Sequence, residues 1–524
     1  MDSENKQDTY HTLFHWKSLR FRLVLEGIVV GLFASLIVIL YRFALSESTI
    51  IITKVYAFLR NKLYFIPILM LAFILIAYIV GMLLKKEPMI SGSGIPQVEG
   101  VLLKKLHMNW LSVIIGKFLG GILSIGSGLS LGREGPSVQL GAAVGQGVSK
   151  AFKRSNVEEK FLITSGASAG LAAAFNAPLA GVLFALEEVH KNFSPFVLLS
   201  SLAAALTADY ISSGFFGLKP ILSFESLSVL PLKSYILIIM LGIIIGVFGA
   251  LFNLMILKTQ KLYSKFKLIP KEFRIIIPLF LSIILGLYLP QVLGGGHELI
   301  INSLTNGNQS IKMLLFVLII KFIFTMVCYG SGAPGGIFLP LLAIGAISGN
   351  LYGLFLVHFL NLDPIYINSF IILAMAGYFT AIVRAPITGI ILITEMTGSF
   401  THLLSISLIS VTAYVVADLL GSKPIYESLL ERFLENHGNV KSSNTKHKTL
   451  LEFAVCMGSV FDGKQIKEIK LPAHCLLVSI RRGEDEIIPK GDTLINAGDY
   501  LIVLVDDNMV SQINDVFHNL VEAK

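Results

Sequence analysis

The sequence predicts an all-α polytopic membrane protein followed by a small cytosolic α+β domain. Hydrophobic residues make up 54% of the chain and charged residues only 15%, whereas an average soluble domain has roughly 25% charged residues. The mean hydropathy is +0.74. Apolar stretches of spanning length recur, and they are too long and uniform for barrel strands. They lie at 23–45, 63–84, 109–131, 195–215, 234–257, 273–290, 311–328 and 402–420.

The N-terminal segment, residues 1–20, is polar and has no small-residue cleavage site, so it is not a secretory signal peptide. Lys17, Arg20 and Arg22 precede the first apolar stretch and indicate a cytosolic N-terminus by the positive-inside rule. We expect a multi-pass protein of the plasma (inner) membrane with both termini cytosolic. The net charge of +8 then reflects topology and attraction to membrane lipid, and no nucleic acid is expected as a partner.

The membrane part contains an internal repeat. Residues 126–145 align without a gap with residues 330–349, and residues 177–187 align with residues 385–395. Apolar segments broken by Gly and Pro at corresponding places of two halves are typical of transporters that hold their site between the halves. We expect a membrane domain at 21–435, with repeat halves at about 21–215 and 230–435.

The segment Gly-Arg-Glu-Gly-Pro at 132–136 is the most informative motif. A glutamate at membrane depth is costly unless it faces a cavity or a partner, so Glu134 indicates an ion or proton pathway. The glycines let backbone N–H groups approach an ion, and the Gly-Pro step opens a helix whose first N–H groups point at an anion. The alternative is a structural ion pair between Glu134 and Arg133.

After residue 435 the composition changes. Residues 436–448 form a polar linker, and residues 449–524 contain short alternating strands with Gly/Asp turns, such as 476–480 and 500–505. The three cysteines have no CxxC spacing, so we expect no disulfide framework, metal or cofactor. The C-terminal part resembles the TrkA-C (RCK-C) regulatory domain, which implies a cytosolic regulatory module with an unidentified small ligand. The segments that carry this resemblance are 463–464, 471–472, 481–483, 488–493 and 497–499.

Three pentapeptides in order, at 92–96 (GSGIP), 132–136 (GREGP) and 336–340 (GIFLP), with Lys-Pro-Ile-Tyr at 423–426, resemble the CLC family of chloride channels and chloride/proton antiporters. The resemblance implies an inverted repeat of tilted, partly broken helices. It also implies a homodimer with an independent anion pathway in each subunit.

The resemblance suggests which residues bind chloride. It assigns the hydroxyls of Ser93 and Tyr426 and the backbone N–H groups of Ile337 and Phe338 to the central anion. Partial charges suit this purpose, because a fixed cation would hold the anion too tightly for turnover. Alternatively, Ser93 caps its own helix and Tyr426 is an interfacial anchor. The supporting residues are Gly92, Gly94, Arg133, Gly135 and Lys117, the last either adding positive potential or snorkelling to an interface.

Two further positions concern the proton. Glu134 resembles the family's gating glutamate, and Glu188 aligns with a second glutamate that delivers the proton from the cytosol in family antiporters, with Glu187 as its supporting neighbour. Alternatively, Glu188 is a helix-end acid bonded to His190, Lys191 or another subunit. Glu395, the repeat mate of Glu187, is expected to be structural.

We therefore predict a transporter rather than an enzyme, with chloride and protons as substrates. The first hypothesis is a chloride/proton antiporter and the second is a passive voltage- or pH-gated chloride channel. A cation-coupled solute carrier or sensor is a third alternative, but the glycine-flanked helix N-termini favour an anion. Serine at 93, where nitrate-preferring family members often have proline, favours chloride.

Overall fold

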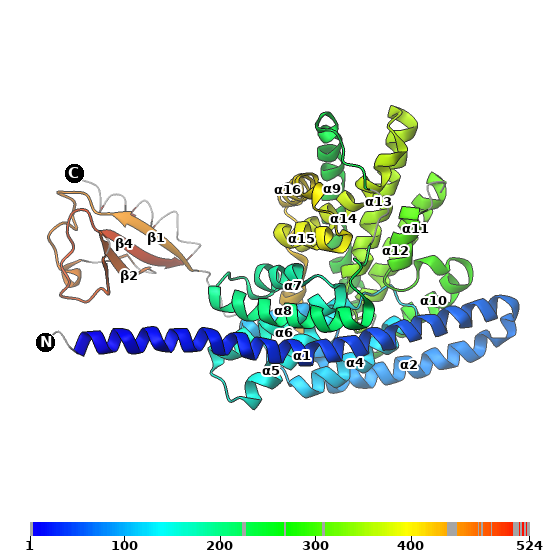
Figure 1. The fold of residues 1–524 in the computed structure, drawn as a ribbon, viewed down its shortest axis with the longest axis horizontal. Coiled ribbons are helices and arrows are strands. Elements are labelled where there is room, and N and C mark those ends of the chain that lie inside the picture. The colour runs from blue at the N-terminus through cyan, green and yellow to red at the C-terminus, as the bar shows by residue number, and fades with distance from the viewer. Residues whose placement is uncertain are drawn as a thin grey trace. The chain divides into compact units, whose positions relative to one another are not determined.

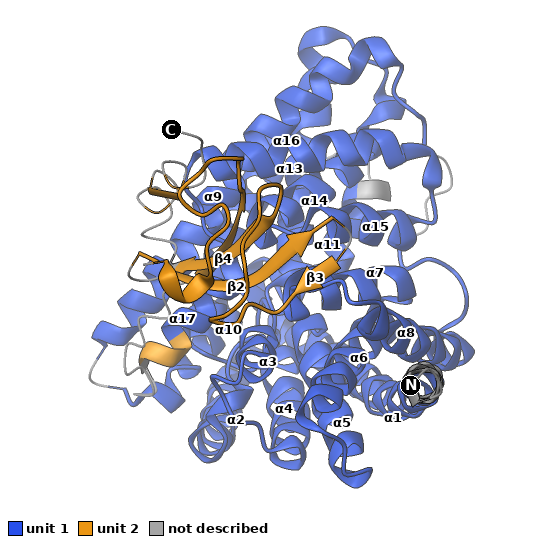
Figure 2. Cartoon of the chain, turned by 90° about the vertical axis from the view of Figure 1, so that its left-hand side faces the viewer, with its two compact units in different colours: residues 1–432 blue, residues 433–524 orange. Residues whose placement is uncertain are grey.

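The computed structural model describes residues 4–222, 227–266, 269–305, 310–436, 448–469, 471–472, 475–483, 485–506, 513, 516–517 and 520, with side chains from residue 21 onward. The chain divides into two compact units, residues 1–432 and residues 433–524, coloured separately in Figure 2. Most of the linker predicted at 436–448 lies outside the described residues.

Within the described residues, unit 1 contains two halves of eight α-helices each, drawn from blue to green and from green to yellow in Figure 1. The first half comprises α1 (Glu4–Asn61), α2 (Ile66–Lys86), α3 (Ile95–Leu102), α4 (Trp110–Gly126), α5 (Glu134–Ala151), α6 (Asn156–Phe175), α7 (Pro178–Phe184) and α8 (Pro195–Phe216). The second half comprises α9 (Tyr235–Lys265), α10 (Ile276–Tyr288), α11 (His297–Thr305), α12 (Ile311–Gly330), α13 (Phe338–Leu360), α14 (Ile367–Val383), α15 (Pro386–Thr397) and α16 (Leu403–Leu419). Helix α17 (Ile425–Asn436) follows.

The two halves pack in the same way. In the first half, α5 lies on α6, and α6 and α8 pack against α1. In the second half, α13 lies on α14, and α14 and α16 pack against α9. Small residues allow these close contacts, because a side chain at Gly141 or Gly349 would meet the backbone of the neighbouring helix. Close backbone approach through small residues is the usual way in which membrane helices associate.

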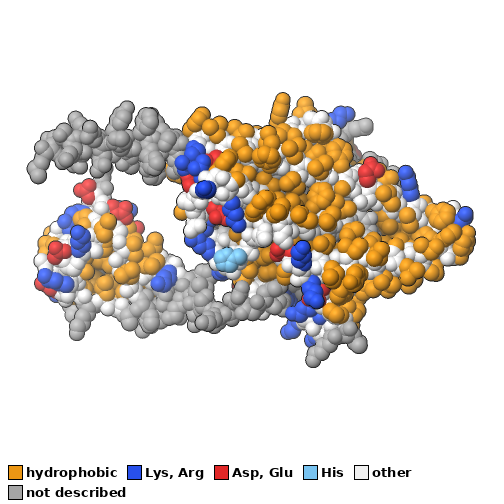
Figure 3. All heavy atoms as spheres, turned by 90° about the horizontal axis from the view of Figure 1, so that it is seen from below, with side chains coloured by type: hydrophobic (Ala, Val, Ile, Leu, Met, Phe, Trp, Pro, Cys, Tyr) orange, Lys and Arg blue, Asp and Glu red, His pale blue; other side chains and the backbone are white. Residues whose placement is uncertain are grey.

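Among the described residues, eight helices are long and apolar enough to cross a membrane, so the protein is a multi-pass membrane protein. Figure 3 shows that hydrophobic side chains cover much of the visible face of unit 1. Two of the eight spans, Phe338–Leu360 and Pro364–Val383, are missing from the predicted list because glycines interrupt the first and the second is almost entirely covered by protein. The spans predicted at 109–131 and 273–290 are wrong. Helices α4 and α10 have only 17 and 13 residues, and neither is among the spans.

Unit 2 contains an antiparallel four-stranded sheet of order β1-β4-β2-β3. The strands are β1 (Lys448–Ala454), β2 (Cys475–Arg482), β3 (Asp485–Ile487) and β4 (Tyr500–Asp506). The predicted strands at 476–480 and 500–505 fall within β2 and β4. The core of the unit contains Phe453, Ile480, Leu501 and Val503 of the sheet, and Phe517, which follows the last strand.

Candidate functional site

The three pentapeptide motifs meet in unit 1. Gly135, at the start of α5, lies against Ser93, since a Cβ at position 135 would be 2.8 Å from Ser93 Cβ. Gly336 lies against Gly135 in the same way, with its would-be Cβ 3.2 Å from Gly135 N. There is no room for a side chain at position 135, and a Cβ at position 336 would press on the backbone of Gly135. Segments far apart in the sequence therefore converge on one point.

Helix N-termini surround this point. Helix α5 begins at Glu134, α13 begins at Phe338 directly after its cap residue Ile337, and α3 begins after Gly94. The first N–H groups of a helix have no partner within the helix and carry about half a positive charge. Ile337 and Phe338 are fully buried. The backbone thus provides a buried electropositive site without a fixed cation.

The Glu134 side chain is buried among these N-termini. It is 0% exposed, and neither carboxylate oxygen has a hydrogen-bond partner among the described residues. The carboxylate turns back toward Gly132, and it interacts with the N–H groups of Leu339 and of Glu134 itself without ordinary hydrogen-bond geometry. Arg133 Nε lies 3.9 Å from Glu134 Oε1, which is longer than a hydrogen bond. Arg133 therefore makes a long ion pair with Glu134 but no hydrogen bond to it.

Ser93 and Tyr426 each present a buried hydroxyl. Ser93 is 1% exposed and Tyr426 is 0% exposed, and neither hydroxyl has a hydrogen-bond partner among the described residues. The cap residue of α3 is Gly94, with φ of 90°, and no side chain caps this helix. Ser93 is therefore not a helix cap. Because Tyr426 is fully buried, it is not an interfacial anchor either.

Aromatic side chains enclose the site, and most of them lie outside the sequence motifs. The Phe338 ring packs against Phe175, Phe184 and Phe379, with centroid distances of 5.2, 6.0 and 4.8 Å. Phe184 meets the Tyr426 ring edge-on at 6.4 Å. These rings give the site an apolar wall, and a low local dielectric strengthens the interaction of an ion with the helix N-termini.

Glu188 lies on a single π-helical turn, Ala185–His190, and is 4% exposed. Its Oε1 has no hydrogen-bond partner among the described residues. The bonding partners that a structural role would use are engaged elsewhere, since His190 Nδ1 pairs with Thr164 Oγ1 at 2.9 Å and Lys191 Nζ with Glu99 Oε1 at 2.7 Å. Isolated π-helical turns are frequent at functional sites.

Glu187 has a different environment from Glu188. Its carboxylate accepts hydrogen bonds from Ile387 N (3.2 Å), Thr388 N (2.8 Å) and Thr388 Oγ1 (2.7 Å) in the first turn of α15. Its repeat mate Glu395 accepts from Leu179 N (3.1 Å) and Ala180 N (2.8 Å) in the first turn of α7. Each glutamate therefore caps a helix of the other half.

Lys117 is fully buried, so it does not snorkel to an interface. Its ammonium group donates to Ile90 O at 2.9 Å and Gly92 O at 2.7 Å. The lysine thereby fixes the turn that presents Ser93. Tyr329, which the motifs do not contain, completes this region from the second half.

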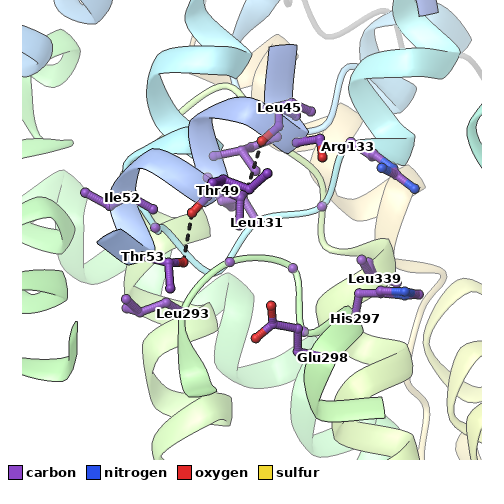
Figure 4. A pocket seen from close by; sticks show the side chains of 18 of the residues that line it. Leu45, Thr49, Ile52, Thr53, Leu131, Arg133, Leu293, His297, Glu298 and Leu339 are labelled. Carbon is purple, nitrogen blue, oxygen red and sulfur yellow. Dashed lines mark hydrogen bonds between the residues drawn. The ribbon is translucent and has the colours of Figure 1, made fainter. Parts of the chain in front are cut away.

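A cavity of about 780 Å³ is lined in part by Gly132 and Arg133, which precede Glu134 in the chain, and by Leu339. Figure 4 shows Arg133, His297 and Leu339 on one side of this cavity and Leu45, Thr49 and Thr53 of α1 on the other. The Thr49 and Thr53 hydroxyls donate to carbonyls of their own helix. The lining also contains Arg42, Arg60 and Lys219, with Glu298 as its single acidic residue. The excess of positive charge favours entry of an anion.

This fold and site define a membrane transporter built from two repeated halves, with unpartnered polar groups where the halves meet. The chain belongs to the voltage gated chloride channel family, whose model matches residues 73–418. The TrkA-C domain model matches residues 450–518.

Several known proteins are similar to this chain. The H(+)/Cl(-) exchange transporter ClcA of Vibrio cholerae serotype O1 is 39% identical over 386 residues, which cover 71% of this chain and 81% of the relative. The crystal structure of a slow cyanobacterial Cl-/H+ antiporter is 34% identical with a TM-score of 0.72, covering 80% of this chain and 99% of that protein. A CLC-type fluoride/proton antiporter is 27% identical with a TM-score of 0.63, covering 78% and 97%.

Proposed function

We propose that this protein exchanges chloride for protons across the membrane, with Glu134 as its gate. Its curated relatives include exchange transporters of H+ and Cl-, and similar solved structures include proton-coupled antiporters. The observation that carries the proposal is the Glu134 carboxylate, which is buried without a hydrogen-bond partner among the described residues, at the N-termini of α5 and α13.

The gate works through competition between a carboxylate and an anion. When Glu134 is ionised, its carboxylate occupies the space beside the Leu339 N–H group and excludes chloride. Protonation removes the negative charge, so the side chain loses its attraction to the helix N-termini and chloride takes its place. One residue thus links proton binding on one side to anion movement.

Glu188 supplies the second proton site. It is buried and its Oε1 has no hydrogen-bond partner among the described residues, while its neighbours Glu99, Lys191 and Glu427 form a charged cluster around it. A buried carboxylate next to a charged cluster suits reversible proton uptake. The preceding residue, Glu187, does not carry the proton in this proposal but caps helix α15.

Between the two glutamates, the anion is bound by donors that carry only partial charges. These are the hydroxyls of Ser93 and Tyr426 and the backbone N–H groups of Ile337 and Phe338, supported by Gly92, Gly94 and Gly135, which leave the backbone accessible. Arg133 and the cavity cations raise the local concentration of anions. Chloride is the proposed anion because serine rather than proline stands at position 93.

We also propose the assembly and orientation of the protein. All of the proposed ligands come from one chain, so a homodimer would contain two complete pathways. In this proposal, both termini lie on the cytosolic side of the plasma (inner) membrane. Unit 2 binds a small regulatory ligand on that side.

The decisive experiment is a flux measurement on the full chain in liposomes, with an outward chloride gradient and a clamped voltage. Exchange predicts sustained proton movement against the proton gradient, driven by chloride. Chloride current without proton movement would instead identify a passive channel.

A further inference from the structure

The inverted repeat provides an internal comparison at the Ser93 turn. Lys321, the repeat mate of Lys117, is also fully buried and donates to Val292 O at 2.9 Å and Gly294 O at 2.7 Å. These contacts reproduce those of Lys117 with Ile90 O and Gly92 O. Gly92 therefore corresponds to Gly294, and the residue that corresponds to Ser93 is Gly295. The second half has no hydroxyl at this place.

Tyr329, in the last turn of α12, is a second residue that differs between the two halves. Tyr329 occupies the position, counted from Lys321, that Ile125 occupies counted from Lys117. Ile125 lines the cavity described above, together with Gly294 and Gly295 of the equivalent turn. The position that Tyr329 holds beside the Ser93 turn is therefore held by Ile125 beside the Gly295 turn. The hydroxyls of Ser93 and Tyr329 correspond to Gly295 and Ile125 in the repeat, so both differences between the halves occur at the Ser93 turn.

Tyr329 lies directly over the Ser93 turn. It is 3% exposed, and its hydroxyl is 3.2 Å from the place where a Cβ would stand on Gly92. Gly92 has a φ of 59° and is held on both sides by the second half, through Gly92 N to Gly332 O at 3.3 Å and Gly335 N to Gly92 O at 2.9 Å. The absence of a side chain at Gly92 leaves the space that the phenol occupies.

The Tyr329 hydroxyl interacts with the hydroxyl and the N–H group of Ser93, and electrostatically with Tyr426. No hydrogen bond of ordinary geometry satisfies Ser93 Oγ or Tyr426 Oη among the described residues. Three hydroxyl donors thus gather in a buried place, and two of them lack an acceptor within the described part of the chain. Unsatisfied buried donors are costly unless a ligand accepts from them.

We infer that Tyr329 is a third hydroxyl ligand of the transported anion, donating its O–H on the Ser93 side of the central site. This inference rests on the proposed function for the identity of the anion. A small monovalent halide fits this arrangement, because three O–H groups and the helix N-termini can each donate to it without fixing it by a full positive charge.

The test is chloride binding to the purified full-length protein, measured by titration calorimetry. Tyr329→Phe keeps the ring and removes only the hydroxyl, and we expect chloride to bind about tenfold more weakly. Tyr378→Phe is the matched control, because Tyr378 is also fully buried with a hydroxyl that lacks a partner among the described residues, but it packs against Phe248 and Phe252. The control should bind chloride like the wild type. Wild-type affinity in folded Tyr329→Phe would overturn the inference.

A second pair of variants separates a ligand from a residue that only orients Ser93. If Tyr329 contacts the anion itself, Tyr329→Phe weakens chloride binding further in a Ser93→Ala background. If it makes no difference in that background, Tyr329 acts only through Ser93 and the assignment as a ligand is wrong. Failure of the proposed function is distinguishable, since a wild type that binds chloride but moves no protons would leave this binding result intact.

Discussion

Gly132 and Gly336 exchange both of their backbone hydrogen bonds, Gly132 N to Gly336 O at 2.6 Å and Gly336 N to Gly132 O at 2.7 Å. The two glycines are repeat mates, so this antiparallel bridge joins the two halves at equivalent residues. It holds the starts of α5 and α13 beside each other. The Glu134 carboxylate consequently meets the N-terminus of α13 as well as that of its own helix.

Glu134→Gln tests the gate directly. The amide mimics the protonated carboxyl and carries no charge to compete with an anion at the helix N-termini. We expect chloride flux to continue while proton coupling and its pH dependence disappear, measured in liposomes with a pH electrode. Glu47→Gln, at an exposed position of α1, is the matched control and should retain coupling. Coupling of wild-type strength in Glu134→Gln would refute the assignment.

Glu188→Gln should abolish proton transport and leave chloride permeation, because the amide cannot carry a proton and lies away from the anion ligands. Glu187→Gln is the adjacent control. It should keep proton transport but lose about 1–2 kcal/mol of stability, because a neutral amide accepts weaker hydrogen bonds from the first turn of α15 than a carboxylate does. Proton transport that persists in Glu188→Gln would make this residue structural.

Ser93→Pro should shift the preference of the protein from chloride toward nitrate. The change removes one hydroxyl donor to a charged ligand, an interaction of roughly 1.5–3 kcal/mol, which corresponds to about a tenfold or larger change in relative affinity. Competition between the two anions in a flux assay measures the ratio. Ser93→Ala isolates the loss of the hydroxyl from the change in backbone. An unchanged ratio in both variants would remove Ser93 from the ligands.

Lys117→Met and Lys321→Met form a symmetric pair. Each change leaves two buried carbonyls without their donor, and we expect each to lower the free energy of unfolding by about 1–3 kcal/mol. Only Lys117→Met should also weaken chloride binding, because only Lys117 fixes a turn that carries an anion ligand. Thermal unfolding with and without chloride distinguishes the two effects. If both variants lose the same amount of the stabilisation that chloride gives the wild type, the anion ligand is not confined to the turn fixed by Lys117.

In unit 2, Arg482 donates to both carboxylate oxygens of Asp499, from Nε and Nη2 at 2.8 Å each, and Asn496 N donates at 2.9 Å. Burial raises the pKa of Asp499, but these hydrogen bonds and the Arg482 charge outweigh burial, so the net pKa is lowered. The stabilisation is therefore present above the unfolded-state pKa of about 3.9 and is lost as the pH falls through the lower folded-state pKa.

Asp499→Asn should accordingly lower the stability of unit 2 at neutral pH by about 1–3 kcal/mol and flatten its loss of stability in acid. Hydrogen exchange of β2 and β4 in the full-length protein measures both effects. Asp485→Asn, at an exposed position of β3, is the control and should behave like the wild type. If the stability of unit 2 falls in acid in the same way in Asp499→Asn as in the wild type, the Arg482–Asp499 pair does not cause that fall.

The sequence predicted the fold class and the repeat, because glycine and proline are needed at particular backbone positions and so leave a visible pattern. That Ser93, Glu134 and Ile337 would lie at one site was expected from the resemblance of their motifs to the CLC family. Glu99 and Tyr329 could not be found in this way, since they are ordinary residue types within helices α3 and α12. Only tertiary packing brings them to the site.

The errors in the spans have a related cause. Hydropathy detects surfaces that face lipid, whereas α13 and α14 are mostly enclosed by other helices and tolerate many small residues. Conversely, the apolar run at 273–290 contains Arg274 before its helix begins and Pro290 after it ends, and these residues limit α10 to Ile276–Tyr288.

The exchange of caps between Glu187 and Glu395 bears on how the chain is synthesised. Glu187 accepts from an amide 200 residues further along the chain, and Glu395 reaches back 215 residues to Ala180. When the ribosome has delivered only the first half to the bilayer, the N-terminus of α7 is still open and the Glu187 carboxylate has nothing to cap. Neither half is a finished folding unit, so insertion of the second half is also the step that completes the first.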